Sequence, residues 1–253
     1  MTTLSIQNLS LTIDRNRLLD DVSLSIGTGE LVGLIGPNGA GKSSLLRAIT
    51  GNLHGWEGAI DLDGQPLDAV SRQDRAKAIA YLPQTHEGLW PISGRRLVML
   101  GRLPHLGPFS GATDQDYALV EQILRDVDAL AFADRPVTHL SGGELARIWL
   151  ARALAVQAPL LLADEPIAAL DPAHQLATMS LFHNAVKQGQ GVMVVLHDLG
   201  LAARLCDRLV LMDRGKVVAD GTPQNVLTAD RVAAVYKVRL IRDESGGFSL
   251  LPL

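Results

Sequence analysis

The feature that most constrains the fold of this chain is a glycine-rich segment that fits the pattern G-x-x-x-x-G-K-[ST] without a gap. Its residues are Gly36, Pro37, Asn38, Gly39, Ala40, Gly41, Lys42 and Ser43. An unbroken apolar run at 31–35 precedes it, and a helix-like segment that begins with Ser44 follows it. Glycines let backbone N–H groups converge on an anion, and a helix N-terminus adds partial positive charge. The segment therefore predicts a nucleotide phosphate site, with Lys42 directed at the β- and γ-phosphates and Ser43 at Mg²⁺.

Two hydrophobic patterns predict the sheets. Near the N-terminus apolar residues mostly take alternate places, which is typical of antiparallel strands with one buried face. They are Leu4, Ile6, Leu9, Leu11, Ile13, Val22, Leu24 and Ile26. Unbroken apolar runs at 31–35, 160–163 and 192–196 are typical of parallel strands buried on both faces, and a helix-like segment follows each. The prediction is an α/β fold with a mixed core sheet and an N-terminal antiparallel β-subdomain.

The stretch 86–159 has a different pattern. Its apolar residues recur at helical spacing, as at Val120, Ile123 and Leu124, and it contains no strand-like run. We interpret it as an inserted α-helical subdomain. The prediction is thus a single domain, 1–253, whose α/β core comprises 1–85 and 160–253.

Composition narrows the class of function. The 23 Lys and Arg against 27 Asp and Glu give a net charge of −4, so there is no electrostatic reason to expect a nucleic-acid partner. The single cysteine, Cys206, excludes an internal disulfide and lies among residues with core-like spacing rather than in a metal-ligand cluster. Mean hydropathy is +0.17, yet no run reaches the roughly 18 apolar residues of a spanning helix. The first residues also lack the pattern of a secretory signal.

An acidic pair supplies the second half of a nucleotide-hydrolysing site. Asp164 and Glu165 follow the apolar run 160–163 at once. A buried parallel strand would deliver Asp164 at its carboxyl end, where Mg²⁺ held by Ser43 is expected. Glu165 would then polarise a water for in-line attack on the γ-phosphate.

Four further segments stand in a distinctive order along the chain. Gln84 ends Tyr81-Leu82-Pro83-Gln84, and Leu140-Ser141-Gly142-Gly143-Glu144 opens an amphipathic helix before the acidic pair. Asp171 ends Ala169-Leu170-Asp171, and His197 follows the apolar run 192–196. With the phosphate loop and the acidic pair, this order resembles that of the ATP-binding cassette (ABC) ATPases, where the segments are the Q-loop, signature motif, D-loop and switch histidine. The resemblance covers nearly the whole chain.

The resemblance implies a P-loop NTPase that hydrolyses ATP with Mg²⁺. In that family the residues that correspond to Ser43, Gln84 and Asp164 bind the metal. The residues that correspond to Glu165 and His197 act at the γ-phosphate. The family also forms a head-to-tail dimer, in which the signature segment of one copy faces the ATP on the P-loop of the other. The ATP-binding residues implied beyond the P-loop are therefore Ser44, Gln84, Ser141, Gly142, Gly143, Glu144 and Asp171.

The chain departs from the family pattern at two positions. Ile13 stands where most members have an aromatic residue that stacks on adenine. Arg15 or Arg17 could place a guanidinium over the base instead, or both could be solvated. Ile167 stands where a small hydroxyl residue is common, and nothing in the sequence explains it.

The resemblance implies that separate permease chains form the pathway across the membrane. The chain would then act peripherally, at the cytoplasmic face of the inner membrane, with a substrate-binding protein as an indirect partner. Permease helices in the family rest near the Q-loop, where this chain has Leu89, Trp90 and Ile92. An apolar cluster there is suited to docking. Packing of Trp90 into the subdomain core is the alternative.

Finer matches concern the cargo. The segments Gly101–His105, Asp171–Gln175 and His197–Leu199 through Cys206–Asp207 resemble those of importers of iron–siderophore complexes, haem and cobalamin. Molybdate importers are close relatives, so another cargo stays open. A non-transport ABC ATPase, such as an iron–sulfur assembly factor, is the alternative of a different class, because such proteins are also single short cassettes.

Overall fold

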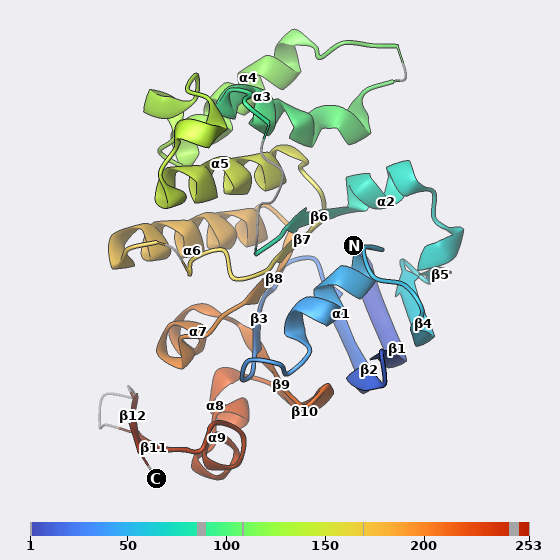
Figure 1. Ribbon diagram of the computed structural model, residues 1–253, viewed down its shortest axis with the longest axis vertical. Coiled ribbons are helices and arrows are strands. Elements are labelled where there is room, and N and C mark those ends of the chain that lie inside the picture. The colour runs from blue at the N-terminus through green and yellow to red at the C-terminus, as the bar shows by residue number, and fades with distance from the viewer. Residues whose placement is uncertain (1, 85–89, 108, 169, 243–247, 253) are drawn as a thin grey trace. The chain divides into compact units, whose positions relative to one another are not determined.

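The computed structural model describes residues 2–84, 90–107, 109–168, 170–242 and 248–252 (Figure 1). The chain divides into two compact units. The first comprises residues 1–67 and 193–253, and the second comprises residues 68–192. Among the described residues no helix is both long enough and apolar enough to cross a bilayer.

The first unit contains most of the strands. In chain order its elements are β1 (Thr3–Ile13), β2 (Asn16–Gly27), β3 (Leu31–Ile35), α1 (Lys42–Ile49), β4 (Glu57–Leu62), β5 (Gln65–Pro66), α7 (Leu199–Leu205), β9 (Arg208–Asp213), β10 (Lys216–Gly221), α8 (Pro223–Val226), α9 (Ala229–Tyr236), β11 (Val238–Arg242) and β12 (Phe248–Pro252). The boundaries between the two units fall within strand β8 (Gly191–Val195) and within the short helix η1 (Leu67–Ala69).

The N-terminal sheet has the strand order β2-β1-β4-β5 and is antiparallel. Leu4 pairs with Ile26 and Ile6 with Leu24, and all four side chains are buried. The register shifts after Ile6, next to Asn8, whose φ is +51°. The alternating pattern in the sequence therefore identified the buried face of this sheet correctly.

Strand β3 is buried throughout, and β9 is buried from Leu209 to Met212. Strand β3 pairs in parallel with β9, and β9 pairs antiparallel with β10, so the sheet is mixed. Cys206 lies against β3: a Cβ at Gly33 would be 2.9 Å from its Sγ. Burial raises the pKa of this thiol to about 12. Cys206 is thus a core residue, as its spacing indicates.

The second unit is mainly helical. Its elements are α2 (Arg72–Ala78), β6 (Ile79–Leu82), α3 (Gly94–Met99), η2 (Leu100–His105), α4 (Asp114–Asp126), η3 (Leu130–Phe132), η4 (Val137–His139), α5 (Gly142–Ala155), β7 (Leu160–Ala163) and α6 (Pro172–Lys187), followed by the start of β8. Strands β6 and β7 are parallel, and α5 packs against α3 and α4. The described residues from 90 to 159 contain helices and a single isolated bridge, but no strand. The exact subdomain bounds stay a prediction.

A buried ion pair lies among the helices of the second unit. Arg102 Nε donates to Asp116 Oδ1 at 2.8 Å, and Arg102 Nη1 donates to the carbonyl oxygen of Ala155. Asp116 Oδ2 accepts from the backbone N–H and the hydroxyl of Thr113, so it completes a capping box at the start of α4. These bonds lower the pKa of Asp116 to about 2, and the bond from the Thr113 backbone contributes most.

Candidate nucleotide site

The predicted phosphate loop joins the end of β3 to the start of α1. Gly36, Gly39 and Gly41 all have positive φ, which side chains disfavour. A Cβ at Gly36 would lie 2.2 Å from the carbonyl oxygen of Met212, and one at Gly41 would lie 2.6 Å from that of Leu18. Glycine is therefore required at both positions for the backbone to pass so close to its neighbours. Gly41, at the N-cap of α1, has no side chain that could cap the first turn, so the N–H groups there can serve an anion.

Lys42 lies inside this loop rather than in solvent. It is 5% exposed, and its Nζ donates to the carbonyl oxygens of Gly36 and Pro37 at 2.7 and 2.9 Å. Ser43 and Ser44 follow in the first turn of α1 and are half-buried. The loop thus presents an ammonium and two hydroxyls beside its converging backbone, a combination suited to phosphate.

The loop has a further neighbour that the sequence did not indicate. The Tyr236 hydroxyl, from α9, accepts a hydrogen bond from the backbone N–H of Gly36. Burial raises the pKa of this phenol well above its usual value, and the Gly36 bond opposes that shift. Tyr236 is far from Gly36 in sequence, so no local pattern could have linked them.

His197 lies in the same unit as the phosphate loop. It is exposed directly after β8, and the backbone N–H of Leu196 donates to the carbonyl oxygen of Leu34 at 3.2 Å. This bond places the end of β8 beside the end of β3, where the phosphate loop begins.

The base-binding position of the family falls in the β1–β2 hairpin. Ile13 is 36% exposed at the end of β1. Arg17 pairs with Asp20 at 2.6 Å, and Asp20 also pairs with Lys216 at 3.0 Å. The Arg17 guanidinium is therefore engaged on its own strand, whereas Arg15 is exposed at the turn.

The acidic pair lies at the carboxyl end of β7, in the second unit. Asp164 is 2% exposed, and its backbone N–H donates to the carbonyl oxygen of Leu82 at 2.8 Å. Glu165 has φ +52°, an uncommon value for a residue with a side chain. Gln84 Nε2 donates to Glu165 Oε2 at 2.7 Å. The structure thus joins the Q-loop glutamine to the second acidic residue, a pairing that the sequence did not predict.

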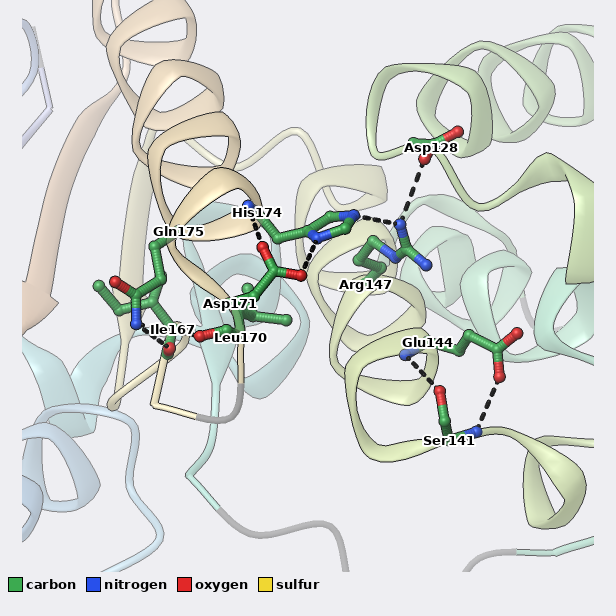
Figure 2. Close-up of polar contacts among 9 residues, drawn as sticks. All are labelled: Asp128, Ser141, Glu144, Arg147, Ile167, Leu170, Asp171, His174 and Gln175. Carbon is green, nitrogen blue, oxygen red and sulfur yellow. Dashed lines mark hydrogen bonds and ion pairs between the residues drawn. The ribbon is translucent and has the colours of Figure 1, made fainter.

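The signature segment begins α5 with a capping box (Figure 2). Ser141 Oγ accepts from the backbone N–H of Glu144, and Glu144 Oε2 accepts from the backbone N–H of Ser141. These bonds, more than the ion pair with Arg135, lower the pKa of Glu144. A Cβ at Gly142 would meet nothing within 4 Å, so the start of α5 is open.

Asp171 caps the start of α6, also shown in Figure 2. Its Oδ1 accepts from the backbone N–H of His174, and its Oδ2 lies 2.8 Å from His174 Nδ1. Hydrogen bonds from His174 lower the pKa of Asp171. Gln175 Nε2 donates to the carbonyl oxygens of Ile167 and Leu170, and the Ile167 side chain is buried. Ile167 is thus a packing residue here, while Ala169 lies outside the described residues.

The docking residues predicted near the Q-loop are only partly described. Trp90 is 77% exposed, so it does not pack into the subdomain core. Ile92 is half-buried, and Leu89 lies outside the described residues. No group of three or more His, Cys, Asp or Glu side chains is placed to hold a metal ion in the part of the chain that the structure describes.

A phosphate loop between a parallel strand and a helix, with a buried Asp after a second parallel strand, defines a P-loop NTPase. Within that class the chain belongs to the ABC transporter family, whose pattern it matches over residues 19–168. The fold class, the family and the ATPase class predicted from the sequence are thereby confirmed.

Two relatives illustrate the match. The hemin import ATP-binding protein of Nocardia farcinica is 45% identical over 221 residues, which are 87% of this chain and 76% of that protein. The cobalamin import ATP-binding protein of Halobacterium salinarum (strain ATCC 29341 / DSM 671 / R1) is 42% identical over 239 residues, 94% of this chain. This chain spans 60% of the length of that second relative.

Two solved structures are similar in fold. A metal-chelate type ABC transporter in an inward-facing conformation has a TM-score of 0.82 at 25% identity, with 100% of this chain and 97% of that chain covered. A dimeric bacterial ABC transporter cassette has a TM-score of 0.77 at 27% identity, with 87% and 98% covered.

Proposed function

We propose that this chain is the ATP-hydrolysing subunit of an importer for a metal chelate, such as hemin, an iron–siderophore complex or cobalamin. The observation that carries the proposal is the 45% identity, over 87% of the chain, to a protein named for hemin import. A relative named for cobalamin import and a structural neighbour of metal-chelate type support the same class of cargo.

The phosphate loop and the start of α1 would hold the triphosphate of ATP. The N–H groups of the loop and of the first turn converge on an anion. Lys42 Nζ now donates to two carbonyl oxygens of the loop, and phosphate oxygens would replace them as charge-assisted acceptors.

The residues assigned to the metal fit Mg²⁺ by their chemistry. Ser43, Asp164 and Gln84 offer hydroxyl, carboxylate and amide oxygens, the ligands this ion prefers. Asp164 is 2% exposed, and a carboxylate so buried is favoured by a nearby positive charge. When bound, Mg²⁺ would supply positive charge to the phosphate oxygens.

Glu165 would act as the general base for the attacking water. Its Oε2 accepts from Gln84 Nε2 at 2.7 Å, which orients the carboxylate. His197 would contact the γ-phosphate from the end of β8. Asp171, at the start of α6, would be a further ATP-binding residue.

We also propose that two copies associate head to tail around ATP. Ser141 and Gly142 are exposed at the N-terminus of the 14-residue helix α5. The N-terminus of such a helix favours a γ-phosphate presented by another molecule. The similarity to a dimeric cassette supports this arrangement.

The importer would place the chain at the cytoplasmic face of the inner membrane through its permease. Trp90, at 77% exposure, is the anchor that we assign to that contact. Large exposed aromatic residues are typical centres of protein interfaces. A substrate-binding protein outside the membrane would deliver the cargo.

Hydrolysis and dimerisation are tested together with Glu165→Gln. The purified wild-type chain should hydrolyse Mg-ATP. The variant should lose hydrolysis and, because it retains the γ-phosphate, should sediment as a dimer in Mg-ATP but as a monomer in Mg-ADP. A variant that stays monomeric in ATP would contradict the proposed dimerisation. Absence of ATPase activity in the wild type would contradict the proposed ATPase function.

The importer role needs a separate test. The tagged chain, purified from membranes of its own host, should carry with it a permease with multiple spanning helices. Uptake of labelled hemin, ferric siderophore and cobalamin by cells that lack the chain would then identify the cargo. Co-purification of soluble iron–sulfur assembly proteins alone would favour the non-transport alternative.

A further inference from the structure

His174 connects two helices of the second unit whose starts carry proposed site residues. It lies in the first turn of α6, and its Nδ1 is 2.8 Å from Asp171 Oδ2, while its Nε2 is 2.8 Å from Arg147 Nη1 (Figure 2). Arg147 belongs to α5, the helix that the signature segment opens. One imidazole thus links the cap of α6 to the signature helix.

The partners of His174 determine where its proton resides. A guanidinium can only donate, so the Nε2 that faces Arg147 must be the acceptor and must carry no hydrogen. The proton is then on Nδ1, which donates to the carboxylate of Asp171. This arrangement requires a neutral imidazole with its hydrogen on Nδ1.

Arg147 is held in place from the other side. Its side chain is 16% exposed, its Nη1 pairs with Asp128 Oδ2 at 3.2 Å, and its guanidinium lies 4.9 Å from the centre of the Phe132 ring. Its Nε is buried, with no hydrogen-bond partner among the described residues. These contacts hold the guanidinium of Arg147 in place beside His174.

A second contact joins the same two segments. A Cβ at Gly143, in the signature segment, would lie 3.8 Å from Leu170 Cδ2, so Leu170 packs against the start of α5. The loop that leads from Glu165 to α6 therefore meets the signature helix at Leu170 and, through His174, at Arg147.

We propose that His174 is a positioning residue, which as a neutral imidazole with its hydrogen on Nδ1 holds Asp171 and the start of α6 against the signature helix. The inference rests on the proposed ATPase function of this site. It assigns His174 no contact with ATP.

Steady-state ATPase assays test the proposal with three variants. His174→Gln keeps an acceptor for Arg147, His174→Ala keeps neither contact, and His183→Gln is the matched control. His183 lies on the same helix, and its Nδ1 is 3.0 Å from the carbonyl oxygen of Met179, one turn earlier in α6.

We expect His174→Ala to lower kcat about tenfold at pH 8, with KM for ATP changed less than about threefold, because the phosphate loop is intact. His174→Gln should keep kcat within about twofold of wild type, as should His183→Gln, because the acceptor for Arg147 is retained. Equal kcat for His174→Ala and wild type, or an equal loss of kcat in His174→Gln and His174→Ala, would overturn the proposal.

Nitrogen-15 NMR of the histidine side chains separates this inference from the proposed function. In the wild-type chain the His174 signals, assigned by their absence in His174→Gln, should show hydrogen on Nδ1 and none on Nε2 at pH 8. Hydrogen on Nε2 would refute the link even if the chain hydrolyses ATP. If the expected tautomer is found in a chain without ATPase activity, the link between α5 and α6 is supported and the proposed ATPase function is contradicted.

Discussion

Gln84 donates its side-chain N–H to Glu165 at 2.7 Å, although 81 residues separate the two. The bond joins the segment after β6 to the residue after β7, and these two strands are parallel neighbours. Because parallel strands end at the same edge of a sheet, the residues that follow them can meet. In the proposed mechanism Gln84 would orient the general base without exchanging a proton itself.

The first prediction concerns this bond. Gln84→Ala should lower kcat for ATP about tenfold or more, because Glu165 loses its orienting donor, with a smaller change in KM. Gln73→Ala is the matched control, since Gln73 Nε2 donates to a backbone carbonyl oxygen, that of Pro104, at 3.0 Å in the same unit. Steady-state ATPase assays compare the two. An equal loss of activity in both variants would show that Gln84 acts only through general stability.

The sequence predicted those parts of the site that are local. The phosphate loop needs a strand, glycines at positive φ and a helix in immediate succession, and all three appear as residue patterns between 31 and 49. The capping box of Ser141 and Glu144 is local in the same way. Element types therefore followed from periodicity, and loop chemistry followed from residue type.

The pairings between distant segments could not be predicted in this way. Hydrophobic periodicity identifies which face of an element is buried but not which side chain on another element it meets. The contacts of Gln84 with Glu165, of His174 with Arg147 and of Tyr236 with Gly36 all depend on that missing information. Trp90 shows the same limit, because an apolar residue fits both a core and an exposed docking surface until its burial is known.

The second prediction concerns the close approach at Gly36. Gly36→Ala should abolish ATP binding or destabilise the chain by more than about 2 kcal/mol, because its Cβ would meet the Met212 carbonyl oxygen at 2.2 Å. Gly39→Ala is the control, since it also has positive φ but nothing within 4 Å of its Cβ position. Nucleotide binding by fluorescence and thermal melting compare them. Equal effects would mean that backbone strain, rather than the contact with Met212, sets the requirement.

The third prediction concerns the buried pair of Arg102 and Asp116. Asp116→Asn should destabilise the chain by about 2–4 kcal/mol, because Arg102 keeps its charge and loses its partner. Chemical unfolding measures the loss. Asp126→Asn is the control, as its exposed carboxylate accepts one bond, from Gln122. A change below about 0.5 kcal/mol for Asp116→Asn would contradict a stabilising role.

The same carboxylate predicts a pH dependence. Its pKa falls from 3.8 to about 2 on folding, so the folded state binds this proton more weakly than the unfolded state does. The stabilisation is therefore complete above about pH 4 and is lost as pH falls toward 2. Unfolding of wild type and Asp116→Asn between pH 2 and 5 should show the two stabilities converging toward the acid end. A difference that stays constant over that range would contradict this origin.

The last prediction concerns Trp90. Its side chain is 77% exposed, and burial of an indole in a permease groove would stabilise the contact by about 2 kcal/mol or more. Trp90→Ala should therefore lose association with permease-containing membranes in flotation assays and keep the ATPase activity of the purified chain. Phe109→Ala is the matched control, because Phe109 is a fully exposed aromatic residue of the same helical stretch. Retained flotation of Trp90→Ala would exclude Trp90 as the anchor, and equal loss in both variants would indicate a diffuse apolar surface rather than one central contact.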